Sequence, residues 1–318
     1  MDRDEGVDQS VAVMRPMKGG DDPYSYNKHS NIQATTFEHA KPTLQFALGS
    51  VSFPDPIDVG IPSRPRLIRV ADLGCATGRN SIAQTSFVLS SLKSRAGPRS
   101  EFFVYFSDLA GTDFNSLIDL LFNSPSPAFN PKTDGLYTGV VPGSFYDQLF
   151  PPSFLHVATC SIALHWLSQD PCPFIPNSVE SRTALGKVQN PGTCWYKHSA
   201  STAVRAAYAA QAHSDLLRFL TNRAVEIAPG GLLWVLLPTA GDTFAHVDGN
   251  GKLIGRWWLD LLDDSWMGLV EDGVLPHSTI DSFNLPTYYR TVAEVRGAVE
   301  ALGKQQDDVV CSYTVQKC

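Results

Sequence analysis

The sequence predicts an α/β fold, in which a parallel β-sheet carries helices on both faces. Apolar runs of strand length alternate along the chain with segments of helical periodicity. The runs are apolar throughout, which is typical of parallel strands buried on both faces. The first run leads directly into a turn with two glycines and then into another helical pattern. Strands and helices that alternate in this way favour a parallel sheet covered by helices.

The first half of the chain supplies two of these strands. A helix is expected over residues 32–48, and a loop with four prolines leads from it to a strand at 67–73. Apolar residues at helical spacing predict the next helix over 81–93. A second buried strand, 102–106, is followed by a helical pattern over 113–122, which the segment NSPSPAFNP ends.

The second half continues the alternation. A third apolar strand is predicted at 154–160, and a long helix over 201–227. Pro229-Gly230-Gly231 is expected to stop that helix, because glycine readily takes the left-handed conformation that ends helices. The run 232–238 is then a fourth strand. Residues 171–193, rich in proline, serine and asparagine, are expected to form a loop or the start of a cap.

Composition limits the function classes. The chain has 318 residues, a net charge of −7 and 43% hydrophobic residues, enough for a large core. No basic stripe with interleaved aromatic residues is present, so a nucleic-acid partner is not expected. No apolar run approaches the length of a membrane span, and the acidic start MDRDEGVDQS does not resemble a signal peptide. The six cysteines form no CxxC pair, which predicts reduced thiols in a cytoplasmic protein.

The glycine turn after the first strand predicts the ligand. Its pattern runs D-x-G-x-x-x-G from Asp72 to Gly78, which differs from the GxGxxG fingerprint of dinucleotide sites. A carboxylate inside the turn repels phosphates, which disfavours a nicotinamide oxidoreductase. Asp108 follows the second strand, where a ribose would need an acceptor. The two acids suit a nucleoside with a positive centre, such as S-adenosyl-L-methionine; the alternative is a solvent-exposed aspartate beside an ordinary tight turn.

Several motifs in order along residues 14–295 resemble the plant SABATH carboxyl methyltransferases, named for salicylic acid, benzoic acid and theobromine. The motifs are MKGGDDPYSYNKHSNIQ (17–33), ADLGCATGRNS (71–81), SDLAGTDFN (107–115), GVVPGSFYDQLFP (139–151), SIALHWLSQ (161–169), AYAAQAHSDLLRFLTNRAVEIAPGG (207–231) and DSFNLPTYY (281–289). The resemblance implies a Rossmann-like methyltransferase sheet with a helical cap over the active site. It also implies methyl transfer from S-adenosyl-L-methionine to a small carboxylic acid.

The resemblance further implies which residues contact the methyl donor. They are Lys18, Ser30, Asp72, Asp108, Leu109, Ser144 and Phe145. Each also has a simpler interpretation when taken alone: Lys18 as a solvated lysine, Ser30 as a helix cap and Phe145 as a core aromatic residue. The agreement of all positions in one collinear set favours the functional interpretation.

Gln33 and Trp166 correspond to the family's residues for the substrate carboxylate. An amide and an indole are neutral donors, which orient a carboxylate without cancelling its nucleophilic charge. A carboxylate is already deprotonated near neutral pH, so no general base is required. Catalysis would come from in-line alignment and exclusion of water. His165 is expected to line the pocket or simply to pack there. Ile162 stands where many aromatic-acid members have tyrosine.

A magnesium site is a further implication of the resemblance. Its candidate ligands are Asn190, Asp281, Phe283 and Asn284. Asp281 and Asn284 offer the oxygen ligands that magnesium prefers. The alternative is an ordinary turn before Pro286.

The expected organisation has four parts. Residues 1–30 close over the cofactor, 31–240 form the methyltransferase core, 241–300 form the cap and substrate wall, and 301–318 form an atypical tail. Because the tail does not resemble the family's ending, a second hypothesis is an impaired paralogue that acts as a binding or dimer partner. The first hypothesis is an active enzyme that makes the methyl ester of a benzoate-, salicylate- or cinnamate-like acid or of a plant hormone acid. A homodimer is a further expectation.

Overall fold

The computed structural model describes residues 16–20, 22–53, 65–97, 99–123, 135–172, 190–196, 201–239, 246–247, 253–255, 258–281 and 283–305. The chain divides into two compact units, each of which is treated by itself. The sheet unit comprises Arg15–Leu164, Arg218–Leu237 and Leu302–Cys318. The helical unit comprises Met1–Met14, His165–Leu217 and Pro238–Ala301.

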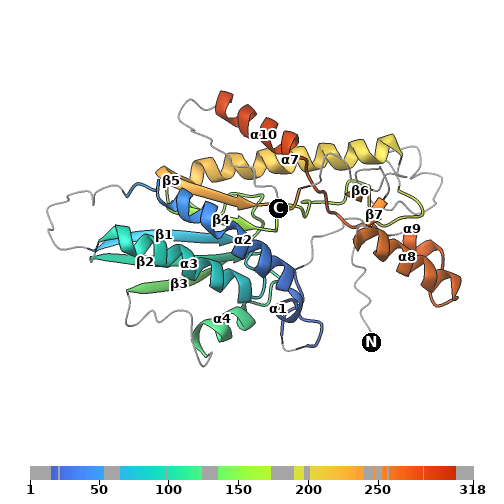
Figure 1. Cartoon of the computed structure of the whole chain (residues 1–318), viewed down its shortest axis with the longest axis horizontal. Coiled ribbons are helices and arrows are strands. Elements are labelled where there is room, and N and C mark those ends of the chain that lie inside the picture. The colour runs from blue at the N-terminus through green and yellow to red at the C-terminus, as the bar shows by residue number, and fades with distance from the viewer. Residues whose placement is uncertain are drawn as a thin grey trace, which may run out of the picture. The chain divides into compact units, whose positions relative to one another are not determined.

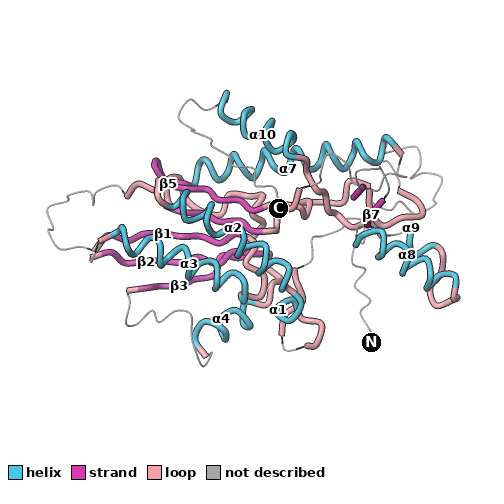
Figure 2. Tube along the Cα trace, in the orientation of Figure 1, coloured by secondary structure: helices cyan, strands magenta, loops and turns pink. Residues whose placement is uncertain are grey.

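A five-stranded sheet forms the centre of the sheet unit. Its strands are β1 (Arg66–Leu73), β2 (Ser100–Asp108), β3 (Leu136–Pro142), β4 (Leu155–Ser161) and β5 (Ile227–Leu236). They are all parallel and lie in the order β3-β2-β1-β4-β5; Figure 1 labels them, and Figure 2 draws strands in magenta. The strand order reverses between β1 and β4, and ligands of open α/β sheets bind at such a point beyond the carboxyl ends of the strands.

Four helices accompany the strands: α1 (Tyr26–His29), α2 (Asn31–Leu48), α3 (Arg79–Ala96) and α4 (Phe114–Phe122). Helix α2 packs on α3 and β5, and α3 packs on β1, β2 and α4 (Figure 1). Leu44, Val88 and Leu92 of the helices and Val70 of β1 are fully buried in this core. The apolar faces of the helices therefore cover a sheet that is itself apolar, as the sequence predicts.

The helical unit has its own core. It contains α8 (Trp258–Glu271), α9 (Ser278–Asp281), most of α10 (Val292–Gln305) and the antiparallel pair β6 (His246–Val247) and β7 (Leu253–Gly255). Helix α7 (Thr202–Glu226) begins in this unit and ends in the sheet unit. Trp195, Tyr196 and Tyr208 are buried together with Leu167. No helix among the described residues is long and apolar enough to span a membrane.

The predicted α/β class with a parallel sheet is confirmed, and the predicted strands and helices match within a few residues. One boundary is wrong. Helix α7 ends at Glu226, and β5 starts at Ile227, so Pro229-Gly230-Gly231 lies inside the strand. The pairing of β4 with β5 shifts register between Leu155 and Val157, and β5 is the last strand of the sheet. A proline is tolerated at such an irregular edge.

Strand β3 was not predicted. It lies at the other edge of the sheet, and its residues alternate between buried, half-buried and exposed positions, so it lacks the continuous apolar run of the inner strands. Most of the expected 171–193 loop and residues 306–318 of the expected tail lie outside the described residues. Residues 301–305 continue α10.

Candidate active site

The glycine turn after β1 has a backbone that other residues fit poorly. Gly74 has a φ of +86°, and a Cβ added there would lie 2.7 Å from the Cβ of Ala163. Gly78, before α3, has a φ of +105°, and its added Cβ would lie 3.0 Å from Leu117 Cγ. The backbone amides of Gly74 and Cys75 both donate to the carbonyl of Ser107, at 2.8 and 3.1 Å. The end of β2 therefore fixes the turn.

Asp72 is a buried carboxylate with three partners of its own. Its side chain accepts hydrogen bonds from Ser81 Oγ, from Gln84 Nε2 at 2.9 Å and from Thr159 Oγ1 at 2.7 Å. Burial raises the pKa of Asp72 to about 6, although these hydrogen bonds act in the opposite direction. A carboxylate has about four lone-pair sites, so one site on Oδ2 is left beyond these three donors.

Asp108 braces the same turn from β2. Its Oδ2 accepts from the backbone amide of Ala76 at 2.7 Å, and its Oδ1 accepts from Leu109 N at 2.7 Å and from Thr112 Oγ1 at 2.9 Å. Ala76 has a φ of +47°, a left-handed conformation that is uncommon for a residue with a side chain. Asp108 thus stabilises a strained turn and keeps one lone-pair site on Oδ2.

Helix α1 and its neighbours are hydrogen-bonded to the start of α3. Asn27 Nδ2 donates to Thr77 O at 3.2 Å, and Asn80 Nδ2 donates to Ser30 O at 3.0 Å. Ser30 is fully buried at the N-cap of α2, but its hydroxyl makes no capping bond and has no hydrogen-bond partner among the described residues. A buried hydroxyl of this kind is suited to a ligand.

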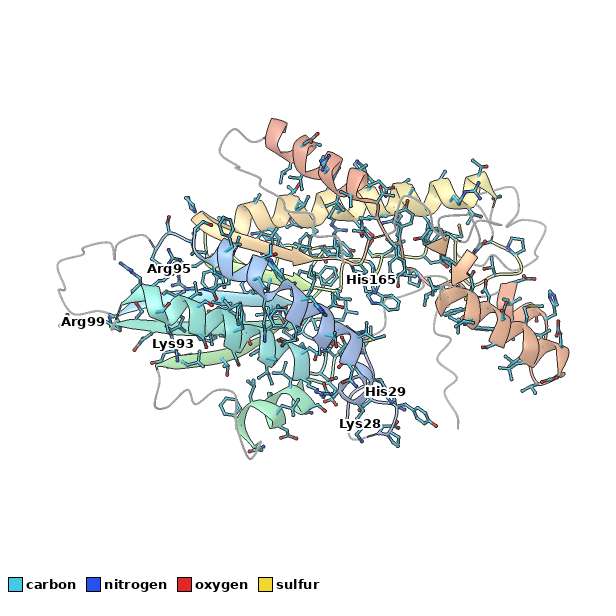
Figure 3. The ribbon with its side chains drawn as sticks, viewed as in Figure 1. Lys28, His29, Lys93, Arg95, Arg99 and His165 are labelled. Carbon is cyan, nitrogen blue, oxygen red and sulfur yellow. The ribbon has the colours of Figure 1, made fainter. Side chains whose placement is uncertain are left out.

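Lys18 and His29, which lie before and within α1, each contact a neighbouring residue of the same segment. Lys18 is exposed, and its Nζ lies 2.8 Å from Asp22 Oδ2 and 5.7 Å from the centre of the Tyr24 ring. His29, which Figure 3 labels beside Lys28, places its Nε2 2.6 Å from the carbonyl of Pro23. The Lys18 side chain is therefore held by a surface ion pair in this conformation.

A pocket of about 550 Å³, counted with its open mouth, lies at the carboxyl ends of β1 and β4. Gln33 and Asp72 both line it, as does Ile162. The Gln33 Oε1 atom is buried and has no hydrogen-bond partner among the described residues. Ile162 has a φ of +51°, which is a genuine outlier for a β-branched residue and is typical of strain at functional sites.

Ser144 and Phe145 lie on the loop after β3. Ser144 Oγ accepts from the backbone amide of Tyr146 at 3.2 Å. The Phe145 ring contacts Tyr146 and Phe219 edge-on, with ring centres 4.8 and 6.0 Å apart. One edge of it lies 3.7 Å from the position of a Cβ on Gly74. The loop therefore reaches the glycine turn within the sheet unit.

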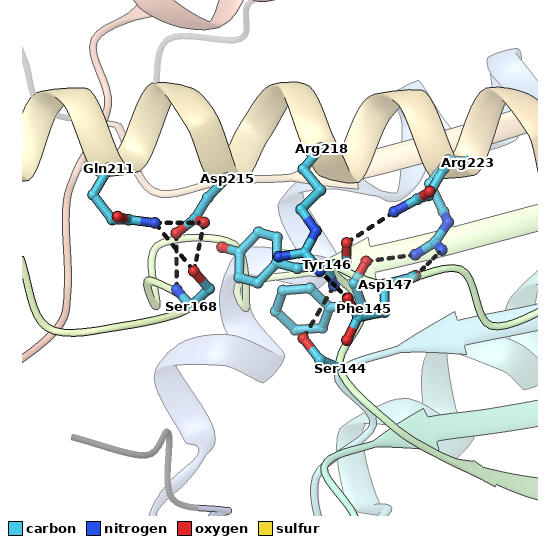
Figure 4. Close-up of polar contacts among 10 residues, drawn as sticks. Ser144, Phe145, Tyr146, Asp147, Ser168, Gln211, Asp215, Arg218 and Arg223 are labelled. Carbon is cyan, nitrogen blue, oxygen red and sulfur yellow. Dashed lines mark hydrogen bonds and ion pairs between the residues drawn. The ribbon is translucent and has the colours of Figure 1, made fainter. Parts of the chain in front are cut away.

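In the helical unit, His165 and Trp166 follow β4 along the chain. The His165 ring lies between Trp166 and Tyr289, with ring centres 5.4 and 5.5 Å away. Burial, together with the charge of Arg290, lowers the pKa of His165 to about 4, so its imidazole is neutral at pH 7. The next turn is tied to α7, since Ser168 donates to Asp215 from its amide at 2.8 Å and from its hydroxyl at 2.6 Å (Figure 4).

The candidate magnesium ligands converge in the helical unit. Asn190 Nδ2 donates to Asn284 Oδ1 at 3.1 Å, and Asp281 Oδ1 accepts from the amide of Gly192 at 2.8 Å. Phe283 stacks on Trp266 at 5.3 Å. The described residues contain no cluster of three or more His, Cys, Asp or Glu side chains that could hold a metal. The Oδ1 atoms of Asn284 and Asp281 each already accept one hydrogen bond, so a metal ion could use only the remaining lone pair of each atom.

Comparison with known proteins decides the family. The family described as SAM-dependent carboxyl methyltransferases matches residues 12–313. The chain belongs to this family. It is 34% identical over 305 residues to gibberellic acid methyltransferase 1 of Arabidopsis thaliana, covering 93% of this chain and 76% of that protein. Loganic acid O-methyltransferase of Catharanthus roseus is 32% identical over 290 residues, which cover 90% and 72%.

A solved structure of a loganic acid methyltransferase with SAH superposes with a TM-score of 0.71 at 31% identity, covering 90% of this chain and 75% of that one. The predicted SABATH membership and methyltransferase fold are therefore confirmed. The protein is an S-adenosyl-L-methionine-dependent carboxyl O-methyltransferase. The remaining acceptor site of Asp72 and the unpartnered Ser30 hydroxyl fit a donor with a cationic end.

Some residues of this carboxyl methyltransferase were missed by sequence reasoning. Tyr26, Cys75, Asn80 and Gln84 line the pocket with Asp72. Gln84 is 3% exposed, and its Nε2 bridges Asp72 and Thr159 while its Oε1 accepts from Ser161 Oγ. The available signal was a polar residue on the helix face that also carries Ser81 and Thr85, close after the glycine turn. The individual contacts of the donor and of the acid remain predictions.

Proposed function

We propose that this carboxyl methyltransferase acts on a bulky plant-hormone or terpenoid acid, with the donor's cationic end at Asp72 and the acid's carboxylate at Gln33. One observation carries the proposal. Asp72 and Gln33 line the same pocket of the sheet unit, although they are 39 positions apart in the sequence. A group that attracts a cation and a neutral amide that can orient an anion thus share one space.

The proposed reaction is a displacement, in which a carboxylate oxygen of the acid bonds to the methyl carbon and the bond from that carbon to the donor's sulfur breaks. S-adenosyl-L-methionine supplies the electrophilic methyl group. Asp72, as a carboxylate, holds the positive end of the donor, and Ser30 offers it a buried hydroxyl. The Gln33 amide orients the acid; its oxygen and nitrogen exchange places by rotation of the terminal torsion, which presents an N–H to the carboxylate. The acid is ionised at neutral pH, so no residue has to remove a proton.

Trp166 and His165 lie in the helical unit and remain the further residues that the family resemblance assigns to the acid. The indole N–H of Trp166 is a neutral donor, and the imidazole of His165 is neutral at pH 7. Neutral groups suit this task, because a cation beside the carboxylate would reduce its nucleophilicity. Lys18, Asp108, Leu109, Ser144 and Phe145 remain the proposed contacts of the rest of the donor.

The acid class is proposed from the pocket wall. Ile162 presents a branched aliphatic side chain to the pocket, with no hydroxyl or ring. Such a wall buries apolar surface of the acid, and the absence of the tyrosine that many aromatic-acid members have here favours an alicyclic acid. The names of two relatives, gibberellic acid methyltransferase 1 and loganic acid O-methyltransferase, support this choice. Benzoate-, salicylate- and cinnamate-like acids are the competing class.

Two measurements test the proposal. Calorimetry with S-adenosylhomocysteine tests the donor site, and transfer of a radiolabelled methyl group to a panel of alicyclic and aromatic acids tests the reaction. We expect binding and preferential esterification of alicyclic acids. A folded protein that does not bind S-adenosylhomocysteine overturns the donor assignment. Donor binding without turnover of any acid would instead support the impaired binding protein.

Three finer points accompany this function. We propose a homodimer in the cytoplasm, to be tested by light scattering and by cell fractionation. Magnesium at Asn190, Asp281, Phe283 and Asn284 remains a separate proposal, which the family resemblance supports and the Asn190–Asn284 hydrogen bond opposes. A magnesium titration followed by thermal melting tests this site: a rise in melting temperature supports magnesium binding, and an unchanged melting temperature opposes it.

A further inference from the structure

The loop over residues 144–150 is held by a buried ion pair at the end of α7. Arg223 and Glu226 are both fully buried, and Arg223 Nη2 lies 2.7 Å from Glu226 Oε1. An arginine and a glutamate three residues apart on a helix usually form an ion pair on the protein surface. Here the pair is enclosed, so its charges act on protein groups.

Among the described residues, the side-chain hydrogen bonds of the pair go to the backbone of this loop or join the two residues to each other. Arg223 donates to the carbonyls of Phe145 and Asp147, each at 2.8 Å (Figure 4). Glu226 Oε1 accepts from the amides of Leu149 and Phe150, at 2.6 and 3.2 Å. The pair therefore engages the loop from both ends, with donors at one side and an acceptor at the other.

Neighbouring contacts of the pair extend to the Phe145 ring. The Arg223 guanidinium lies 5.3 Å from the centre of the Phe219 ring, and Phe219 contacts Phe145 edge-on. Asn222 Nδ2 adds a hydrogen bond to Tyr146 O at 2.8 Å. Both the backbone and the ring of Phe145 are thus set by one turn of α7.

The pair is a poor device for stability alone. Arg223 Nε and Glu226 Oε2 are buried and have no hydrogen-bond partner among the described residues. A buried ion pair often stabilises a protein less than apolar residues of similar volume would. What the pair provides is directional, charge-assisted bonding to four backbone groups.

We propose that Arg223 and Glu226 are positioning residues that set the Ser144–Phe145 segment for the adenosine part of the methyl donor. This inference rests on the proposed function, in which Ser144 and Phe145 contact the donor. Neither side chain of the pair is among the residues that line the pocket, and both are fully buried. Loss of the pair therefore weakens donor binding and leaves the acid site and the displacement step unchanged.

The double variant Arg223→Met/Glu226→Met tests the inference, because it removes both charges together and leaves no unpaired buried ion. We expect it to melt cooperatively, to bind S-adenosylhomocysteine and adenosine about tenfold more weakly, and to keep kcat within about twofold at saturating donor. The KM for the acid should stay constant. A role in folding alone would not produce this separation of donor KM from kcat.

Arg218→Ala is the matched control. Arg218 pairs with Asp147 of the same loop, but both side chains are more than half exposed, at 56% and 55%. Such a pair contributes little, so donor affinity should stay within about twofold of the wild type. Glu226→Gln is a graded variant that keeps an acceptor oxygen for the loop amides but removes the counter-ion of Arg223, so its melting is measured first; about a threefold loss of donor affinity is expected in the folded variant.

The outcomes separate the two proposals. If the wild type does not bind S-adenosylhomocysteine, the proposed function fails. If the wild type binds it and the folded double variant binds it equally well, only the positioning role fails. Should the double variant not fold, unchanged affinity in Glu226→Gln overturns the positioning role.

Discussion

Replacement of Asp72 by asparagine should make the protein without its donor more stable at neutral pH. Asparagine has nearly the same shape as aspartate. Its oxygen can accept from Gln84 and Thr159, and its amide can donate to the Ser81 hydroxyl, which reverses one bond of the present network. The substitution therefore removes a buried charge and retains the hydrogen bonds.

The size of the effect follows from the pKa of Asp72. Burial raises it from 3.8 to about 6, a shift of about 2 units. At about 1.4 kcal/mol per unit, ionisation of Asp72 costs about 3 kcal/mol of folding free energy. The sign follows from proton binding. Between about pH 4 and pH 6 the folded state holds a proton that the unfolded state has lost, so wild-type stability falls as the pH rises through this window.

Urea unfolding at a series of pH values checks this prediction. The advantage of Asp72→Asn should be near zero below about pH 4, should grow through the window and should reach about 3 kcal/mol above about pH 6. Asp119→Asn, at an exposed carboxylate of α4, is the control and should change stability by less than about 0.5 kcal/mol at any pH. An Asp72→Asn variant that is less stable than the wild type at pH 7, or whose advantage does not vary with pH, would refute the reasoning.

The same variant tests the function. A charge-assisted hydrogen bond contributes about 1.5 to 3 kcal/mol, so binding of S-adenosylhomocysteine should weaken by about ten- to a hundredfold. If Asp72 is retained for binding rather than for stability, Asp72→Asn should be more stable than the wild type and should bind the donor more weakly. Equal donor affinity in the two proteins would show that Asp72 does not hold the donor.

Four shorter predictions follow. Wild-type affinity for S-adenosylhomocysteine should fall about tenfold per pH unit below about pH 6, because Asp72 must lose its proton to bind a cation, and calorimetry of Asp72→Asn should show no such slope. Trp166→Phe should raise the KM for the acid about tenfold without altering donor binding, and a changed donor affinity would contradict the assignment. Ile162→Asn should add about 1 kcal/mol of stability in thermal melts by relieving the left-handed strain, and it should change acid preference in the methyl-transfer assay. Chelation with EDTA tests the magnesium proposal: loss of activity that magnesium restores would support a metal site, and turnover that stays within about twofold would refute it.

The position of the two acids could be predicted from the sequence, whereas their contacts with the donor stay predictions. The apolar runs at 67–73 and 102–106 identify inner strands; Asp72 is the last but one residue of the first run, and Asp108 follows the second run by two residues. Parallel strands deliver their carboxyl ends to one edge, so the acids had to lie close together. The structure bonds the Asp108 carboxylate to Ala76 of the glycine turn and the Asp72 carboxylate to Ser81 at the start of α3.

The edges of the fold could not be predicted in the same way. Strand β3 is partly exposed and carries a glycine, so its pattern resembles a loop. The start of β5 contains Pro229-Gly230-Gly231, a strong turn signal, yet pairing with β4 overrides it. Local propensity is a weak indicator wherever a neighbouring strand supplies the hydrogen bonds.

Three features of the structure are unfavourable by local stability rules, and each lies at the site or beside it. Asp72 is a buried charge, Ile162 is a β-branched residue in the left-handed region, and Arg223 with Glu226 forms an ion pair inside the protein. Each lowers stability in isolation, so packing alone does not explain it. Asp72 and Ile162 line the pocket, and the ion pair holds the loop that carries Phe145. Departures from local rules are expected where binding requires a fixed geometry, which is why these residues are the first to mutate.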